Sequence, residues 1–163
     1  MHTLNVGPTP QGRNPLHRAS SGASHRLLVL VVAAGLAVDA YVHWRLAPGF
    51  DGIQGTASPH FSQGGLFRLE AALAVVAMLL VLLTRSRFGA LVAFLVAAGG
   101  LGAVLLYAYL DVGTIGPLPD MYDPIWYPEK TISAIAEAVA AVGSLALFTL
   151  PYLASEGESS TSS

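Results

Sequence analysis

Four apolar segments constrain this chain most, because each is long enough to cross a lipid bilayer as a helix. A bilayer core needs about 20 mostly apolar residues per helix. The segments run from Arg26 to Ala47, from Leu66 to Thr84, from Phe88 to Leu110 and from Thr131 to Leu153. The second segment differs from the others in that Arg68 and Glu70 interrupt it near its start. The sequence therefore predicts an all-α fold, a membrane-embedded four-helix bundle with antiparallel up-down topology.

Composition agrees with this architecture. Hydrophobic residues make up 53% of the 163 residues and charged residues only 11%, whereas about a quarter of an average soluble domain is charged. Residues 1–25 and 154–163 are rich in small and polar residues, so we expect disordered tails on either side of a helical domain at 26–153. Residues 27–40 also resemble a cleavable signal peptide, but the apolar and aromatic character continues to Trp44, which favours a retained helix.

The distribution of basic residues predicts an orientation. One side of the bundle has three arginines before the first helix and two in the turn between the second and third helices: Arg13, Arg18, Arg26, Arg85 and Arg87. The other side has basic residues only at helix ends: Arg45, Arg68 and Lys130. The positive-inside rule then places both termini in the cytoplasm. We expect a multi-pass protein of a bacterial cytoplasmic membrane, with the lipid bilayer as its first partner.

The chain contains no cysteine. This excludes disulfides, thiolate metal sites, iron–sulfur clusters and the attachment of c-type haem. No basic stripe suggests a nucleic-acid partner. The sequence identifies no cofactor.

Charged residues within the four segments all lie toward one end of the predicted bundle. An inner ring would consist of Asp39, His43, Glu70 and Glu137, and an outer rim of Arg45, Arg68, Asp111, Glu129 and Lys130. Asp39 and His43 are four residues apart, so they share one helix face. Ionisable groups are costly in hydrocarbon, which makes such a cluster a candidate site by default.

One interpretation of the cluster is a structural network of ion pairs. It would pair Arg68 with Asp39 or Glu137, His43 with Asp39, and Lys130 with Asp111. Buried carboxylates persist when they are paired or protonated, and such a network would meet that need without any ligand.

The other interpretation is a functional site. Carboxylate oxygens and imidazole nitrogens are suitable ligands for a divalent metal, and the candidate ligands are Asp39, His43, His60, Glu70 and Glu137. The same groups would also suit a proton relay or a pocket for a polar headgroup. The sequence does not decide between the two interpretations.

The segment from Asp111 to Lys130 differs from an ordinary loop. Four prolines alternate with bulky side chains, among them Met121, Trp126 and Tyr127. Prolines restrict the backbone, and Tyr and Trp favour the headgroup region. We expect an ordered, non-helical strap over the charge cluster, acting as an interfacial anchor or as a lid, whereas the first loop, 48–65, is predicted to be flexible.

Three stretches, at 39–47, 66–70 and 121–131, resemble those of small four-span bacterial membrane proteins with no established activity. The resemblance covers roughly residues 26–153 and implies the four-span fold but no substrate. No common catalytic motif is present, which favours a non-enzymatic accessory or binding subunit that serves another membrane protein or a homo-oligomer. The alternatives are an ion- or proton-coupled transporter or metal-binding protein and, third, an intramembrane enzyme.

Overall fold

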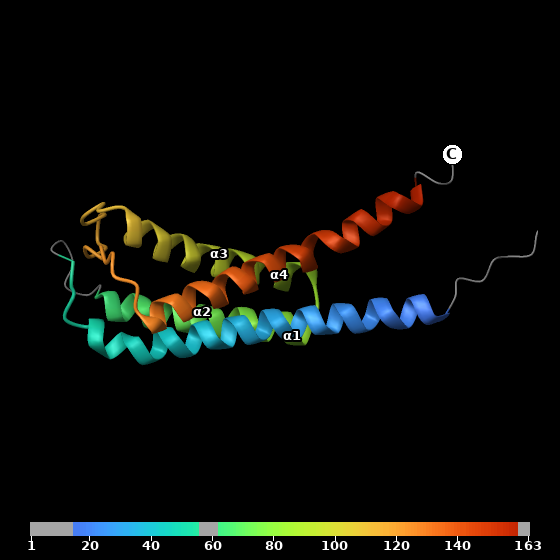
Figure 1. Cartoon of the computed structure of the whole chain (residues 1–163), viewed down its shortest axis with the longest axis horizontal. Helices are drawn as coiled ribbons and strands as arrows, with labels where there is room; N and C mark the ends of the chain where they lie inside the picture. Colours follow the sequence, from blue (N-terminus) through green and yellow to red (C-terminus); the bar gives the residue numbers. More distant parts are fainter. Residues whose placement is uncertain (1–14, 56–61, 160–163) are drawn as a thin grey trace, which may run out of the picture.

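The structure, a computed structural model, describes residues 15–55 and 62–159 and consists of four long helices (Figure 1). They are α1 (Pro15–Leu46), α2 (Gln63–Thr84), α3 (Arg87–Tyr109) and α4 (Pro128–Ser159), and a short 3₁₀ helix, η1 (Ala47–Phe50), follows α1. Within the described residues there is no strand, only two isolated bridges at 54/62 and 115/118. The predicted all-α fold is confirmed, and all four helices are long and apolar enough to cross a membrane.

The helix ends differ from the predicted bounds. α1 begins at Pro15 and α4 continues to Ser159, so both helices extend into segments that were predicted as tails. Helices α2 and α3 each begin at a serine N-cap. The Ser62 hydroxyl accepts a hydrogen bond from the Gly65 N–H at 3.0 Å, and the Ser86 hydroxyl accepts one from the Gly89 N–H at 3.1 Å. Such caps satisfy amide groups that the first helical turn leaves without partners.

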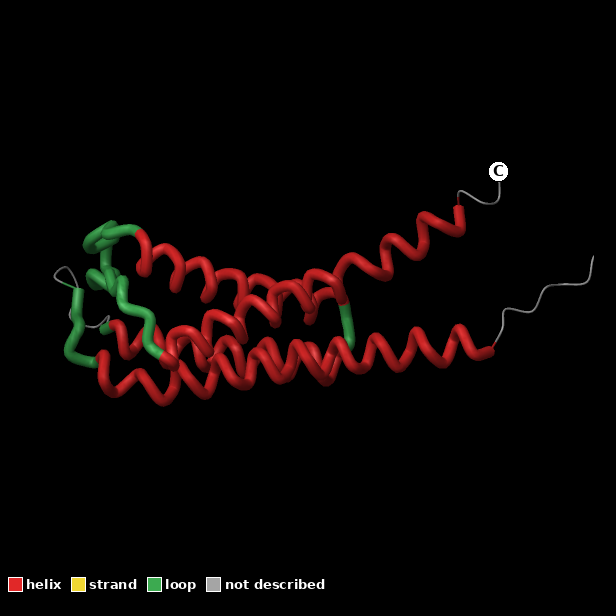
Figure 2. Tube along the Cα trace, viewed as in Figure 1, coloured by secondary structure: helices red, strands yellow, loops and turns green. Residues whose placement is uncertain are grey.

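Neighbouring helices run in opposite directions around a closed ring. α1 packs against α2 and α4, and α3 packs against the same two helices, so that α1 and α3 lie on a diagonal. Both long connections lie at one end of the bundle, called here the loop end, while the first turns of α1 and the last turns of α4 lie at the opposite end (Figures 1 and 2). At that opposite end only Arg85 and Ser86 separate α2 from α3, and Arg85 adopts a left-handed conformation with φ of 46°.

Small residues allow α1 and α4 to pack closely. A Cβ atom added to Gly35 would lie 2.9 Å from the carbonyl oxygen of Ala136, and one added to Gly143 would lie 2.7 Å from a methyl group of Val32. Fully buried Leu36 and Ala140 complete this packed region, which we define as Val32, Gly35, Leu36, Ala140 and Gly143. Close backbone approach of this kind is how membrane helices gain packing energy.

The segment after α3 crosses the loop end without forming a helix, as predicted. Residues 128–130, which were predicted to belong to the strap, form the first turn of α4, so we use the name strap for residues 111–127. Its position is fixed by a backbone hydrogen bond from the Asp123 N–H to the Tyr107 carbonyl of α3, at 3.0 Å. At its far end the Lys130 ammonium of α4 donates to the carbonyls of Asp123 and Ile125. The strap is therefore tied to both helices that it connects.

Candidate functional site

An acidic and a basic side chain of α1, Asp39 and His43, meet a buried serine of α4, Ser133. Asp39 Oδ1 lies 2.8 Å from Nδ1 of His43, one turn further along α1. The Ser133 hydroxyl of α4 donates to the same carboxylate oxygen at 2.8 Å and lies 3.4 Å from the His43 nitrogen. All three residues are buried. The predicted pairing of His43 with Asp39 is confirmed.

Two further carboxylates reach the same place from α4 and α2. Glu137 is fully buried one turn after Ser133, and Glu70 comes from the second turn of α2. Gly100 of α3 leaves room for both: a Cβ atom at this position would lie 2.5 Å from Glu137 Oε1 and 3.0 Å from Glu70 Oε1. The structure thus brings together the four residues of the predicted inner ring. We call Asp39, His43, Glu70, Ser133 and Glu137 the polar cluster.

The residues of the predicted rim do not form one group. Arg68 makes two hydrogen bonds with Asp51, at 2.6 and 2.8 Å, so its predicted pairing with Asp39 or Glu137 is wrong. The first loop folds back after η1 and places Asp51 beside the start of α2. The two hydrogen bonds from Arg68 hold the pKa of Asp51 below its ordinary value.

The remaining rim residues lie apart. Lys130 is buried and contacts the strap, with its ammonium 3.5 Å from the Asp123 carboxylate, so the predicted pair with Asp111 is also wrong. Asp111 is exposed, Glu129 is half-buried in the first turn of α4, and Arg45 is exposed beside the Tyr41 hydroxyl at 3.3 Å. His60, the predicted second nitrogen ligand, lies outside the described residues.

The strap is held by Lys130 in a second way. Its ammonium lies 5.4 Å from the centre of the Trp126 ring and 6.0 Å from that of Tyr127, within range of cation–π attraction. Burial raises the pKa of the Tyr127 hydroxyl, with nearby Asp123 adding to the effect. Both aromatic rings therefore pack onto the first turn of α4.

In the part of the chain that the structure describes, the carboxylates of the polar cluster have no cationic partner other than His43. Glu137 Oε1 and Oε2, Asp39 Oδ2 and Glu70 Oε1 are buried and accept no hydrogen bond. Among the described residues, no lysine or arginine nitrogen lies within ion-pair distance of them, because Arg68 and Lys130 are bound elsewhere. An unpaired buried carboxylate costs several kcal/mol unless a proton or another cation neutralises it. Of the pairs predicted for a closed structural network, the described residues contain only His43–Asp39, which leaves Glu70 and Glu137 without a cationic partner there.

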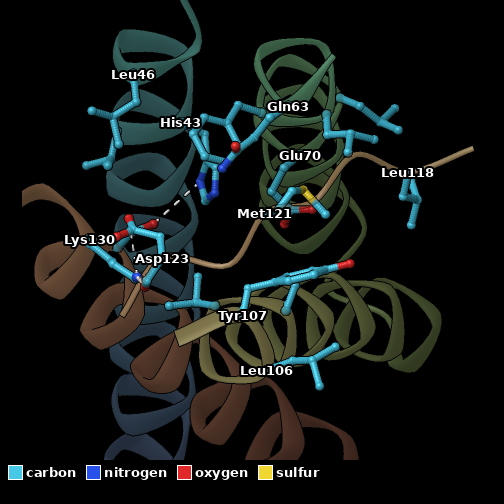
Figure 3. Close-up of a pocket in the computed structure, with 18 of the residues that line it drawn as sticks. His43, Leu46, Gln63, Glu70, Leu106, Tyr107, Leu118, Met121, Asp123 and Lys130 are labelled. Carbon is cyan, nitrogen blue, oxygen red and sulfur yellow. Dashed lines mark hydrogen bonds and ion pairs between the residues drawn. The ribbon is translucent and has the colours of Figure 1, made fainter. Parts of the chain in front are cut away.

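A cavity of about 550 Å³ lies beside the polar cluster and under the strap (Figure 3). His43, Glu70 and Ser133 form the part of its wall that belongs to the cluster. Most of the wall is apolar and comes from α1, α2, α3 and the strap, including Leu46, Leu66, Phe67, Leu73, Val104, Leu106, Leu118 and Met121, whereas α4 contributes only Lys130 and Ser133. Figure 3 shows His43 and Glu70 projecting from α1 and α2 toward Met121 of the strap and Tyr107 of α3.

Several residues of the site were not predicted to belong to it. Tyr107, Gln63, Ser133 and Gly100 line the cavity, and none of them was among the predicted site residues. Ser133 carries a detectable signal, since it lies four residues before Glu137 on the same helix face. Gln63 carries no such signal in the sequence.

Comparisons with protein-family models, with curated proteins and with solved structures found no match.

Proposed function

We propose that this chain is a multi-pass membrane protein whose four helices cross a bacterial cytoplasmic membrane with both termini inside. The outward faces of the helices support embedding: Leu83 is 79% exposed, Val142 71% and Leu95 60%. Apolar side chains exposed to this extent on every side are matched to lipid rather than to water. The basic residues before α1 and around the α2–α3 turn support the orientation. In this orientation the loop end, with the cavity, faces away from the cytoplasm.

We further propose that the protein is non-enzymatic and binds a small amphiphilic molecule in the cavity. The observation that carries this proposal is the 550 Å³ space, which has apolar walls and a buried polar cluster on one side. Ligand sites of roughly 300–1,000 Å³ typically combine apolar walls with a few well-placed polar groups. The strap supplies Leu118, Met121 and Tyr127 to the wall, which supports a role as a lid over a bound molecule.

The free groups in the wall define the chemistry of the ligand's polar end. Glu70 lines the cavity and its buried Oε1 accepts no hydrogen bond, while the ammonium of Lys130 is bound to strap carbonyls. A head that donates hydrogen bonds, a hydroxyl or an amine, matches an unsatisfied carboxylate. An anionic head would instead face the carboxylates of Glu70 and Asp123, which line the cavity. We therefore infer a ligand with an apolar body and a hydroxyl or amine head.

Native mass spectrometry of the protein released from lipid nanodiscs tests this proposal. The nanodiscs are incubated with dodecanol, dodecylamine or dodecanoic acid, which share a chain length and differ in the head. We expect one molecule of the alcohol or the amine per chain, and at least about tenfold weaker binding of the acid, which corresponds to about 1.4 kcal/mol.

A pair of neighbouring substitutions controls for partition into lipid. Ala103 of α3 lines the cavity, so Ala103→Leu fills part of it and is expected to abolish binding. Gly102→Leu adds an equally large side chain at a position where a Cβ atom meets nothing within 4 Å, so binding is expected to persist. Equal retention in both variants, or tightest binding of the acid, would contradict the proposal.

A further inference from the structure

Three side chains of the polar cluster have the arrangement of a metal site. Asp39, His43 and Glu137 each offer one ligand atom, and these atoms all lie within 4.8 Å of one another. All three residues are buried, and they come from the first and the last helix of the bundle. The group therefore exists only when α1 and α4 are packed together.

The unsatisfied oxygens of this group point to a cation. Both carboxylate oxygens of Glu137 and Oδ2 of Asp39 are buried and accept no hydrogen bond, although each side chain is almost completely shielded from solvent. Within the described residues, the nearest basic side chains are engaged with Asp51 and with the strap. We propose that Asp39, His43 and Glu137 bind a divalent transition-metal ion, with Zn²⁺ preferred. This proposal does not depend on the binding of an amphiphile.

The donor set selects the class of ion. One imidazole nitrogen and two carboxylate oxygens are ligands that Zn²⁺ accepts, with three protein ligands leaving a fourth position open. At bond lengths near 2.1 Å, tetrahedral ligand atoms are about 3.4 Å apart. Asp39 Oδ1 and His43 Nδ1 are 2.8 Å apart and all the ligand atoms lie within 4.8 Å of one another, a range that includes this value. Mg²⁺ and Ca²⁺ prefer oxygen ligands alone, whereas an imidazole nitrogen suits Zn²⁺ and other transition metals, so His43 favours this class of ion.

Neighbouring groups hold the ligands in place. The Ser133 hydroxyl donates to Asp39 at 2.8 Å, and the Phe67 ring contacts the His43 imidazole edge-on with centroids 5.2 Å apart. Such outer contacts orient metal ligands and often determine affinity. His43, Glu70 and Ser133 also line the cavity, which gives an ion a path to the buried carboxylates.

The test uses the full chain without an affinity tag, in nanodiscs, after removal of metal with a chelator. Zn²⁺ is then titrated in competition with a fluorescent chelator, and the bound metal is measured by inductively coupled plasma mass spectrometry. We expect one Zn²⁺ per chain, a rise in the melting temperature by ligand linkage, weaker binding of Mn²⁺ in line with the general affinity order, and no competition from Mg²⁺.

Variants identify the site. Glu137→Gln keeps the volume and removes the charge, and we expect it to weaken Zn²⁺ binding by at least about 100-fold, since loss of outer contacts alone costs 10–100-fold. Ser144→Ala, at another fully buried serine of α4, leaves the affinity unchanged. Ala103→Leu also retains Zn²⁺ while excluding the amphiphile, so failure of one proposal is distinguishable from failure of the other.

Two results would overturn the proposal. One is the absence of stoichiometric Zn²⁺ in the wild-type protein, which would mean that protons alone neutralise the carboxylates. The other is unchanged affinity in Glu137→Gln. Should that variant not fold, X-ray absorption at the zinc edge of the wild-type protein decides the question: the spectrum of a shell with one imidazole and oxygen ligands supports the site, and an all-oxygen shell contradicts it.

Discussion

The packed region and most of the polar cluster lie next to each other on α1 and α4, yet the two regions use small residues for opposite purposes. Gly35 and Gly143 remove side chains so that backbone and methyl groups of α1 and α4 meet directly. Gly100 also lacks a side chain, but the atoms that occupy the space are the carboxylates of Glu137 and Glu70. A glycine in a membrane helix therefore does not mark a helix contact by itself. A glycine that faces the backbone or methyl groups of another helix allows close packing, whereas a glycine that faces polar side chains leaves space for a polar site.

The largest expected effect breaks the packed region. Gly35→Leu would drive a side chain against the Ala136 carbonyl, 2.9 Å from the Cβ position, and against Ala140. Because one of these neighbours is backbone, neither a rotamer change nor a small shift removes the overlap. We expect a loss of about 3 kcal/mol in the free energy of unfolding, the upper end of typical overpacking costs, measured by titration with a denaturing detergent in mixed micelles and followed by circular dichroism.

Gly99→Leu is the matched control for this substitution. A Cβ atom at Gly99 meets nothing within 4 Å, and leucine has a higher helix propensity than glycine by about 0.5–1 kcal/mol. The control is therefore expected to be neutral or slightly stabilising. An equal effect of the two substitutions would show that the α1–α4 contact is not part of the folded bundle.

A smaller effect compares two buried serines of α4, one in the polar cluster and one next to the packed region. Ser133 donates to Asp39 at 2.8 Å, whereas the Ser144 hydroxyl is fully buried without a hydrogen-bond partner. Ser133→Ala leaves a buried carboxylate with one donor fewer, and hydrogen bonds to charged groups contribute about 1.5–3 kcal/mol. We expect a loss of about 2 kcal/mol in the same detergent titration of the metal-free protein.

Ser144→Ala should cost nothing or stabilise the protein. The substitution removes a hydroxyl whose burial costs desolvation free energy that no hydrogen bond offsets. If both substitutions are neutral, the Asp39 carboxylate does not need the serine, and the cluster is held by its other members alone.

The smallest effect concerns acid stability and the ion pair between Arg68 and Asp51. Arg68 lowers the pKa of Asp51 in the folded protein, from an ordinary value of about 3.8. The stabilisation is therefore complete above the ordinary pKa and is lost as the pH falls through the lower, folded value. Asp51→Asn should flatten the decline of the melting temperature below about pH 4. The same decline in Asp111→Asn, which alters an exposed residue of the strap, is the expected control.

The four helices and the meeting of the inner ring follow from the sequence for simple reasons. Apolar segments of similar length that alternate in direction bring Asp39, Glu70 and Glu137 to one end of the bundle. Arg68 was assigned the wrong partner because Asp51 lies in a loop without periodicity, where no pattern indicates its distance from a helix. The size of the cavity depends on how the side chains of five segments meet, and single positions such as Gln63 and Met121 do not report this.

The two-residue turn and the ring order have a consequence for the synthesis of this protein. Helices α2 and α3 form a hairpin joined by Arg85 and Ser86, and in the membrane arrangement proposed above this hairpin would be inserted as one unit. Asp39, in contrast, finds its only described hydrogen-bond donor from another helix at Ser133, 94 residues later in the chain. Until the ribosome has produced α4, the first helix holds an acidic group that lacks this donor. The final helix thus completes both the bundle and the site, and a nascent chain that stops before α4 would present Asp39 to the quality-control machinery of the cell.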